Sequence, residues 1–462
     1  MPLATYPPKI IRIPTGSAAS AAESTLQNPI NDTVNRTALS PGSVLRRQNR
    51  QQILTLLAKH RKLSRTELCL RTGLTGAAVS RITRELLQAE LLEETKEKVV
   101  KGSLGRRKSS LSLNPAGACV LGVTIAANKL MVALIDAEQA VVCEQSVENP
   151  PVDKSGLADT NGRLPSPNHS SLVETLISAA ESLLQQNGID RQRLVGIGIS
   201  VAVPSADSIT SEGRVTSRIL GWEDVPVAEP FIQAFNLPVA IDARAMSLLR
   251  AELYSGVEQG GGRDANSVFL INVGLGIGTA SIVANSVLSS GNSGFGGLSH
   301  MAHPASDINC YCGRSGCLEL CASGAAVVCE LMSDAWQVET PFDSLRSGLD
   351  DALQRADAGD KIARDAFFVA GLRMSAGVDS INCLINPDLV VLAGETGRQP
   401  DYIEGLRAGL KQSRSRMSAE QLKLSTVRSV QGAACTALDA FVFSQELNLP
   451  NLRSDAQVSD VS

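Results

Sequence analysis

The sequence is poor in aromatic residues, has no long apolar run and lacks the apolar core of a signal peptide. Aromatic side chains make up 3% of the 462 residues, which argues against the stacking surfaces that bind single-stranded nucleic acids. No apolar run approaches the ~20 residues that cross a bilayer, and nothing near the first methionine resembles an export signal. We therefore expect neither a membrane protein nor a secreted disulfide scaffold, and we expect a cytoplasmic location.

The remaining composition is that of an ordinary globular protein, with 43% hydrophobic and 19% charged residues. A chain of 462 residues is longer than one compact core usually holds, which predicts two or three domains. Without an export signal, the ten cysteines are expected to be reduced thiols or metal ligands.

Charge is distributed unevenly along the chain, although the net charge is only −4. Residues 41–110 contain 16 Lys and Arg against 6 Asp and Glu, a net charge of +10, whereas residues 111–462 carry −15. A basic segment joined to an acidic body predicts a module that binds a polyanion. A solvated basic face without a partner is the alternative.

Composition and the spacing of apolar residues divide the chain into four segments. Residues 1–40 are rich in Ala, Ser, Thr, Pro and Asn, which predicts a flexible tail. Residues 41–114 have helical spacing followed by a hairpin pattern. Residues 115–447 alternate strand-like runs with helices, which predicts an α/β body of two lobes. Residues 448–462 are predicted to form a second flexible tail.

The basic segment contains the local signals of three helices. The pattern becomes helical from Arg46 and continues to about His60. Ser64 and Glu67 form a capping-box sequence that opens a short second helix, and Gly73 suits the turn that ends it. A third helix follows, with one apolar face at helical spacing formed by Val79, Ile82 and Leu86.

These helices, followed by a predicted hairpin over residues 91–113, are typical of a winged helix-turn-helix. Small and basic residues opposite the apolar face of the third helix would enter a major groove. The basic tip of the hairpin would contact phosphates or the minor groove. The predicted DNA contacts are Thr75, Ala77, Ser80, Arg81, Arg84, Arg106 and Arg107. A helical bundle that binds protein is the alternative.

Three cysteines within eight positions, separated by glycines, predict a metal site at Cys310, Cys312 and Cys317. His300 and His303 are candidate fourth ligands. A Cys3His set forms a closed tetrahedral zinc site, which organises a loop rather than activating water. Buried free thiols are the alternative.

The chain order and these motifs resemble the ROK family of repressors and sugar kinases over about residues 45–445. The most specific similarity is to the family's zinc-binding consensus, and this match selects His300 over His303. It reads His300-x9-Cys310-x-Cys312-Gly313-x-x-Gly316-Cys317-Leu318-Glu319. Further matching segments are 220–222, 241–243, 274–278 and 386–394.

The resemblance implies a fold and a set of site residues. It implies a two-lobed, actin-like body with a ligand cleft, a zinc loop over residues 300–319 and one structural Zn²⁺ per chain. In kinase members, the residue matching Asp242 is the general base, and those matching His300 and Glu319 hold sugar hydroxyls. We therefore expect these three residues to bind an effector, with Asp242 a vestigial base and no catalytic residue.

The sequence also departs from the kinases of the family. These carry an Asp-x-Gly-Gly-Thr phosphate loop where residues 124–128 read Thr-Ile-Ala-Ala-Asn, so we expect phosphoryl transfer to be lost. In the sugar pocket, Ile241 replaces an asparagine and Gly297 replaces a glutamate. Two alternatives stay open: an effector unlike the usual sugars of the family, or the loss of effector binding.

The function expected from these features is that of a transcriptional regulator, a repressor of sugar-related genes. It would bind double-stranded DNA as a homodimer or homotetramer, with a sugar or phosphosugar as effector. An active kinase for a hexose or amino sugar is a second hypothesis, supported by Asp242 and the glycine loop 274–278. A third is that the body binds a protein partner.

Overall fold

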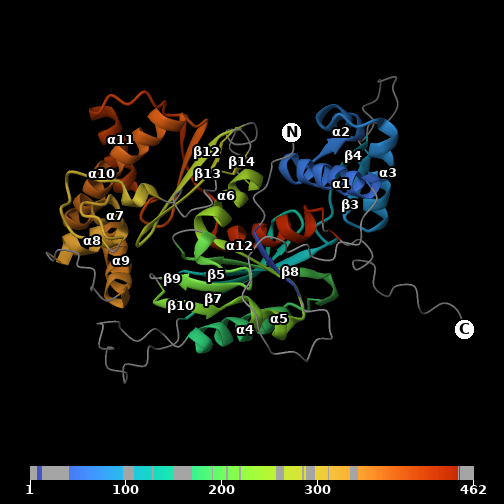
Figure 1. Cartoon of the computed structure of the whole chain (residues 1–462), viewed down its shortest axis with the longest axis horizontal. Coiled ribbons are helices and arrows are strands. Elements are labelled where there is room, and N and C mark those ends of the chain that lie inside the picture. Colours follow the sequence, from blue (N-terminus) through green and yellow to red (C-terminus); the bar gives the residue numbers. More distant parts are fainter. Residues whose placement is uncertain are drawn as a thin grey trace, which may run out of the picture.

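The computed structural model contains a winged-helix module and the two lobes of an α/β body (Figure 1). The structure describes residues 8–12, 41–96, 109–126, 129–148, 169–189, 191–203, 206–217, 220–255, 265–283, 286–287, 297–310, 312–332, 342–445 and 447.

The N-terminal module consists of three helices and a three-stranded antiparallel sheet. Its helices are α1 (Pro41–His60), α2 (Arg65–Thr72) and α3 (Gly76–Gln88). Its strands, in the order β2-β4-β3, are β2 (Leu63–Ser64), β4 (Ser109–Leu113) and β3 (Leu92–Lys96). This is the winged helix-turn-helix that the sequence predicted.

The local signals that predicted the helices are formed. The Ser64 hydroxyl accepts a hydrogen bond from the backbone N–H of Glu67, and the Glu67 carboxylate accepts one from the backbone N–H of Ser64. Gly73 ends α2 with a φ of 71°, in the left-handed region. Helix α1 begins at Pro41 rather than at the predicted Arg46, because proline suits the first turn of a helix.

The first lobe is a six-stranded mixed sheet in the order β1-β11-β8-β5-β6-β7. Strands β11, β8 and β5 are parallel, and β1, β6 and β7 pair antiparallel at the two sides. The strands are β1 (Lys9–Ile11), β5 (Cys119–Ile125), β6 (Leu130–Asp136), β7 (Val141–Val147), β8 (Leu194–Val201) and β11 (Val239–Ala243). One face carries α4 (His169–Gln186), α5 (Ala228–Phe235) and the hairpin of β9 (Arg214–Ser217) and β10 (Trp222–Pro226).

The other face of this sheet is covered by a helix from the C-terminal part of the chain, α12 (Ser429–Ala437). Two glycines allow the helix to lie directly on the strands. A Cβ atom at Gly198 would lie 2.0 Å from the backbone oxygen of Ala433, and one at Gly122 would lie 2.9 Å from that of Val430. Only glycine permits this approach of two backbones.

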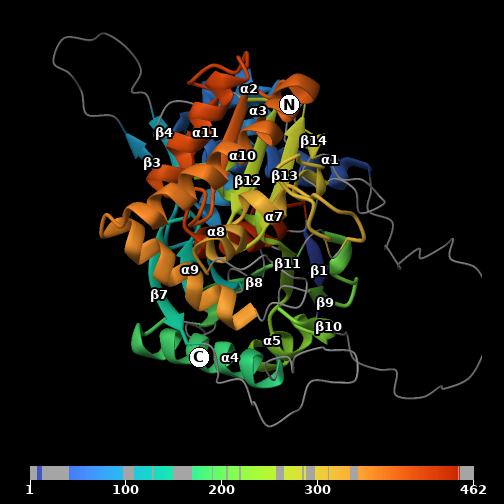
Figure 2. The ribbon, with the colours of Figure 1, turned by 90° about the vertical axis from the view of Figure 1, so that its left-hand side faces the viewer.

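The second lobe is a five-stranded sheet in the order β14-β13-β12-β15-β16 with helices packed against it. Figures 1 and 2 place α10 and α11 on the side away from the winged-helix module. The strands are β12 (Val268–Val273), β13 (Ile277–Val283), β14 (Ser286–Val287), β15 (Leu389–Ala393) and β16 (Leu422–Leu424). The helices are α7 (Glu319–Ala322), α8 (Gly324–Met332), α9 (Phe342–Asp357), α10 (Lys361–Ile385) and α11 (Pro400–Gln412), while α6 (Arg244–Ser255) contacts both lobes.

Among the described residues, only helix α10 has the length and apolar composition that a membrane-spanning helix needs. One of its faces, which includes Phe367, Met374 and Val378, is buried in the hydrophobic cluster of the second lobe. The helix also packs along α11. These are the contacts of a core helix.

The structure corrects the flexible tail predicted over residues 1–40 at one point. Strand β1 (Lys9–Ile11) pairs with β11, and Ile11 packs against Gly213 in the hydrophobic cluster of the first lobe. Three residues are too few for a periodic signal in the sequence. Outside the described residues lie the other tail residues 1–7 and 13–40, the tail 448–462 and the wing segment 97–108.

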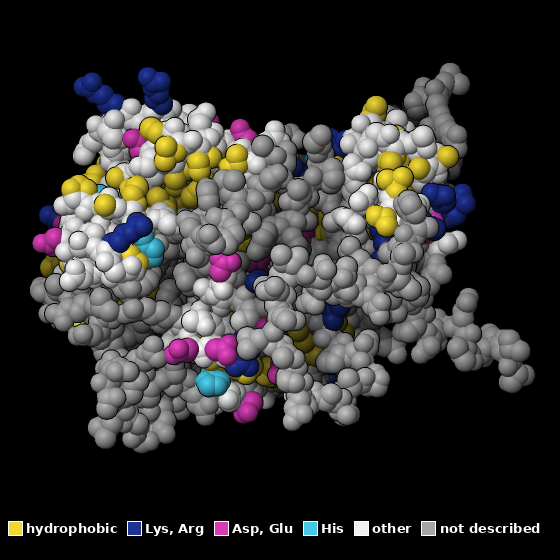
Figure 3. Space-filling model, in the orientation of Figure 1, with side chains coloured by type: hydrophobic (Ala, Val, Ile, Leu, Met, Phe, Trp, Pro, Cys, Tyr) yellow, Lys and Arg dark blue, Asp and Glu magenta, His cyan; other side chains and the backbone are white. Residues whose placement is uncertain are grey.

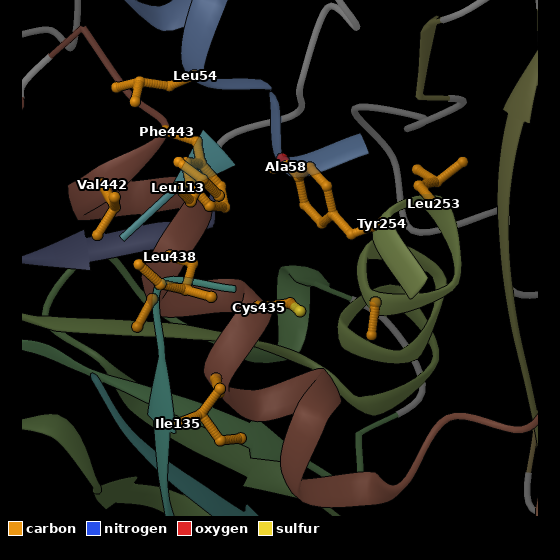
Figure 4. Close-up of a cluster of buried hydrophobic side chains, with 14 of the residues drawn as sticks. Leu54, Ala58, Leu113, Ile135, Leu253, Tyr254, Cys435, Leu438, Val442 and Phe443 are labelled. Carbon is orange, nitrogen blue, oxygen red and sulfur yellow. The ribbon is translucent and has the colours of Figure 1, made fainter. Parts of the chain in front are cut away.

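One hydrophobic cluster joins the winged-helix module to the body. Two polar contacts accompany it: Arg61 donates to the backbone oxygen of Glu138, and Arg50 donates to that of Leu447 at 2.6 Å. The module therefore shares a core with the body. Figure 4 shows part of this cluster, including Leu54, Ala58, Leu113, Ile135, Leu253, Tyr254, Cys435, Leu438, Val442 and Phe443.

Candidate DNA-binding surface, metal site and ligand site

Helix α3 has one buried and one exposed face, as its spacing predicted. Val79, Ile82 and Leu86 are buried, together with Thr83, which the sequence analysis did not include. Of the predicted DNA contacts on this helix and at its N-cap, Ser80 is partly exposed and the others are exposed: Thr75, Ala77, Arg81 and Arg84. The Thr75 hydroxyl also caps α3 by accepting a hydrogen bond from the backbone N–H of Ala78.

Two acidic side chains of the module are paired with arginines of the same module. Arg46 on α1 pairs with Glu85 on α3, and Arg65 pairs with Glu94 on β3 at 2.6 Å. Arg81 and Arg84 form no ion pair with another described residue, so their charge is available to a polyanion. Figure 3 shows dark-blue Lys and Arg atoms at the edge of the module, in the position of α3 in Figure 1.

The wing is described only at its base. Strands β3 and β4 pair antiparallel, with Lys96 opposite Ser109. The predicted contacts Arg106 and Arg107 lie outside the described residues, so their contact with DNA stays a prediction.

The predicted metal ligands converge. The ligand atoms of His300, Cys310, Cys312 and Cys317 all lie within 4.8 Å of one another. The Sγ atoms of Cys312 and Cys317 are 3.6 Å apart, and Cys310 Sγ lies 3.6 Å from His300 Nδ1. Tetrahedral Zn²⁺ with Zn–S distances near ~2.3 Å needs sulfurs roughly 3.8 Å apart. The donor set and its spacing therefore fit a metal ion of this kind.

The two glycines of the metal loop have the positive φ angles that its turns require. Gly313 has a φ of 87° and Gly316 a φ of 71°. A Cβ at Gly316 would also lie 2.5 Å from the backbone oxygen of Ser306. Backbone hydrogen bonds close the loop, with Cys310 N donating to Arg314 O at 2.7 Å. These turns bring the three thiols close together.

The protonation of the cluster suits a metal site. Burial and the nearby Arg314 lower the pKa of His300, which favours the neutral imidazole that ligates metals. Burial and the neighbouring thiols of Cys312 and Cys310 raise the pKa of Cys317 to about 12. A thiolate at this position therefore needs a cation beside it. His303 is not part of the cluster; its Nδ1 accepts a hydrogen bond from Ala305 N.

Glu319, a predicted effector-binding residue, connects the metal loop to the glycine loop 274–278. It is the first residue of α7, is 3% exposed and accepts a hydrogen bond from the backbone N–H of Ile277 at 3.3 Å. The backbone N–H of Gly324 donates to the oxygen of Gly274 at 2.8 Å. The glycine loop is thus braced by the residues that follow the metal ligands.

Asp242, the third predicted effector-binding residue, is held by partners that sequence reasoning missed. It is the penultimate residue of β11, is 2% exposed, and its Oδ2 accepts hydrogen bonds from Arg250 at 3.1 and 3.2 Å. Its Oδ1 accepts one from Ala243 N at 2.8 Å. Arg250 also binds Asp439, which accepts a hydrogen bond from Tyr254. An arginine in the apolar run Leu248–Ala251 was the one available sequence signal.

The three predicted effector-binding residues contact different parts of the structure. His300 faces the thiols and Glu319 faces the glycine loop, whereas Asp242 faces Arg250 on α6, the helix that contacts both lobes. Burial raises the pKa of Asp242, and Arg250 opposes this rise by favouring the ionised form. Both oxygens of the carboxylate accept hydrogen bonds from within the chain.

The chain belongs to the ROK family. The family pattern described as "ROK family" matches residues 120–440, and the pattern described as "Winged helix-turn-helix DNA-binding" matches residues 46–93. The family and fold named by the motifs in the sequence are thereby confirmed.

The chain is similar along most of its length to named bacterial repressors. It is 25% identical over 416 residues to the xylose repressor of Caldicellulosiruptor bescii, covering 88% of this chain and 98% of the relative. It is 25% identical over 410 residues to the DNA-binding transcriptional repressor Mlc of Escherichia coli, covering 85% and 94%. For the dual regulator NagC of the same organism, the identity is 24% over 356 residues, covering 76% and 81%.

Solved structures support the fold. A ROK family transcriptional regulator, a homologue of the E. coli Mlc protein, superposes with a TM-score of 0.63 at 20% identity, covering 88% of this chain and 99% of that one. A ROK family glucokinase from Streptomyces griseus superposes with a TM-score of 0.54 at 20% identity, covering 69% and 98%. The repressor structure thus matches a larger share of this chain than the kinase structure does.

Proposed function

We propose that this protein is a DNA-binding transcriptional repressor of sugar-related genes. The observation that carries the proposal is the exposed face of α3, where Arg81 and Arg84 stand beside the small side chains of Ala77 and Ser80. A helix with small residues near its start can approach base edges in a major groove, and its arginines can reach guanine or phosphate. The relatives named as repressors support the same function.

The body of this repressor is proposed to sense a ligand rather than to transfer phosphate. A kinase base must accept a proton from the sugar hydroxyl, which requires a free carboxylate oxygen within reach. Asp242 instead pairs with Arg250 in a buried position. The absence of the Asp-x-Gly-Gly-Thr loop at 124–128 supports the same conclusion, because metal-bound ATP needs both the acid and the glycines.

The metal is proposed to be one structural Zn²⁺ per chain, held by His300, Cys310, Cys312 and Cys317. Four protein ligands leave no open position for water, so the ion would stabilise the loop. Glu319 lies two residues after the last ligand, so the ion would also fix the position of this carboxylate.

The effector is proposed to be a sugar or phosphosugar, bound with the help of His300, Glu319 and Asp242. The protein is expected to act in the cytoplasm as a homodimer or homotetramer, and a two-fold arrangement of recognition helices predicts a palindromic operator. A thermal-shift screen of sugars and phosphosugars would identify the effector, because a ligand that binds only the folded state raises the Tm.

Selection of genomic DNA fragments by the full-length protein tests the main proposal. We expect one enriched, palindromic sequence at physiological salt. Recovery of no enriched sequence at either low or physiological salt would contradict the proposal.

Three arginine variants give this experiment its controls. Arg81→Ala is expected to relax the base preference at one operator position, by about 1–3 kcal/mol if the arginine contacts a guanine. Arg106→Ala is expected to weaken binding to all sequences alike and to reduce its salt dependence. Arg407→Ala, an exposed arginine on α11 of the second lobe, should change neither.

The alternative of an active kinase is tested by coupled ADP release with a panel of hexoses and amino sugars. We expect no turnover above background. Turnover that is abolished in Asp242→Asn would overturn the assignment of the body as a sensor.

A further inference from the structure

Four buried polar side chains connect the end of β11 to the core shared with the winged-helix module. Arg250 donates to Asp242 Oδ2 from Nε at 3.2 Å and from Nη2 at 3.1 Å, and to Asp439 Oδ2 from Nη1 at 2.7 Å. Tyr254 donates its hydroxyl to Asp439 Oδ1. The four residues, here called the Arg250 network, are between 2% and 9% exposed.

The charges of the Arg250 network make its contacts depend on one another. One guanidinium binds both carboxyl groups, so the two ion pairs share a single cation. Buried carboxylates are stable only while their cation and hydrogen bonds are kept, and a change at one bond of a buried network alters its neighbours. A ligand group that binds Asp242 would therefore change the ion pair between Arg250 and Asp439.

The Asp242 end of the network lies where a polar ligand would arrive. Ligands of parallel α/β sheets bind at the carboxyl ends of the strands, and Asp242 is near that end of β11. It is in register with Ser200 of β8, which is in register with Thr124 of β5. The hydroxyls of Ser200 and Thr124 are buried and have no hydrogen-bond partner among the described residues.

At the other end of the network, Tyr254 belongs to the hydrophobic cluster that packs helix α1 against the body. The Tyr254 ring lies 5.5 Å, centroid to centroid, from that of Phe443. Figure 4 shows the Tyr254 ring next to Ala58 of α1, and both belong to the hydrophobic cluster that joins the module to the body. Because packed cores have little free volume, a shift of this ring requires a shift of α1.

We propose that the Arg250 network transmits the ligand state of the body to the winged-helix module. A ligand hydroxyl bound to Asp242 draws this carboxylate from Arg250, and the change reaches α1 through Asp439 and Tyr254. This inference rests on the proposed function, since it requires an effector and a DNA-binding module. Arg250 and Tyr254 act as positioning residues that touch neither ligand nor DNA.

A matched pair of tyrosine variants tests the proposal. Tyr254→Phe removes one buried hydroxyl from the network and keeps the ring. Tyr402→Phe removes a comparable buried hydroxyl, which donates to Ala322 O at 2.8 Å, from the second lobe. Both full-length variants are compared with the wild type in Kd for the selected operator, in hydrogen exchange of the α1 peptides and in Tm.

Tyr254→Phe is expected to raise the Kd for the operator about fivefold or more, the lower end of common coupling effects, and to speed hydrogen exchange in α1. Tyr402→Phe is expected to leave both unchanged while lowering the Tm by a similar amount. Equal effects of the two variants, or no effect of Tyr254→Phe on Kd and exchange, would overturn the proposal.

The double variant Asp242→Asn/Tyr254→Phe tests the connection itself. If both changes break one chain of contacts, their combined effect on Kd is smaller than the product of the single effects. If the double variant changes Kd by the full product of the two single effects, Asp242 and Tyr254 act independently. If Tyr254→Phe does not fold, faster exchange in α1 of Asp242→Asn supports the connection and unchanged exchange overturns it. Failure of the wild type to select any operator would instead contradict the proposed function.

Discussion

The metal loop and Asp242 are two parts of the proposed effector site, and they differ in how the partners of their side chains are arranged. The metal loop keeps its four ligand atoms within 4.8 Å of one another. Asp242 keeps its place in the sequence, but its carboxylate is bound by Arg250. The metal loop has the clustered ligand atoms that its motif predicts. The carboxylate of Asp242 instead forms an ion pair with Arg250.

The two sites also differ in how far apart in the sequence their contacting residues lie. The predicted metal ligands lie within residues 300–317, where the turns at Gly313 and Gly316 bring them together. The position of the Asp242 carboxylate depends on Arg250. Arg250 in turn pairs with Asp439, which lies 197 residues after Asp242 in the sequence. A change in α6 or near the C-terminus can therefore alter the role of Asp242 and leave the metal site intact.

The largest effect is expected from removing a metal ligand. Cys317→Ser should reduce the zinc content from about one ion per chain to about none, because the side chain is buried and the described residues offer no further donor in the cluster. Elemental analysis of purified protein checks this expectation. Cys383→Ser, which changes an exposed cysteine on α10, should retain the metal. Equal metal content in both variants would contradict the assigned ligands.

Removing the cation of the Arg250 network should have the next largest effect. Arg250→Met leaves two buried carboxylates without their arginine, and it should lower the free energy of unfolding by about 3–5 kcal/mol. Urea unfolding measures this loss. Arg428→Met, at a half-exposed ion pair with Glu144, should cost less than about 1 kcal/mol and serves as the control.

The loss in Arg250→Met should also depend on pH. Burial raises the pKa of Asp242 even in the presence of Arg250, and without the arginine this rise should increase. A carboxyl whose folded-state pKa lies above its unfolded-state value binds its proton more tightly when folded, so stability is recovered as the pH falls. The variant should therefore be closer to the wild type at pH 5 than at pH 8. A deficit independent of pH would contradict this assignment.

A smaller effect is expected at the turns of the metal loop. Gly316→Ala adds a methyl group in the left-handed region and 2.5 Å from Ser306 O, so it should cost about 1–3 kcal/mol. Gly313→Ala has similar φ strain but no atom within 4 Å of the new Cβ, so it should cost less. Urea unfolding of the two variants compares them, and an equal loss would mean that the contact with Ser306 is relieved at no cost.

The smallest effect is expected at a surface ion pair of the second lobe. The Arg364 side chain holds the pKa of Asp401 below its ordinary value. An acid with a lowered folded-state pKa adds stability above its unfolded value near ~4, and this stability is lost as the pH falls through the folded pKa. Because Arg364 is 51% exposed, Arg364→Met should cost under about 1 kcal/mol at pH 7 and less near pH 3, below the unfolded-state pKa of ~4. Urea unfolding at both pH values checks this result.

Local patterns predicted the elements whose stability is local. The capping box at Ser64, the glycine turn at Gly73 and the apolar face of α3 depend on residues a few positions apart, and all three are formed. The convergence of the metal ligands was predictable for the same reason. Strand β1 was not predictable, because it is held by pairing with β11, more than 220 residues away.

The motifs of the sequence were enough to name the family, and short-range spacing was enough to predict the winged-helix module, the exposed basic face of α3 and the clustering of His300 with the three cysteines. Only the tertiary structure decided that Asp242 is bound by Arg250 and that helix α1 shares a core with α6 and with residues 438–443. The physical reason is that a buried charge requires a partner and an apolar face requires a cover. Which distant residues supply them is set by the packing of the whole chain.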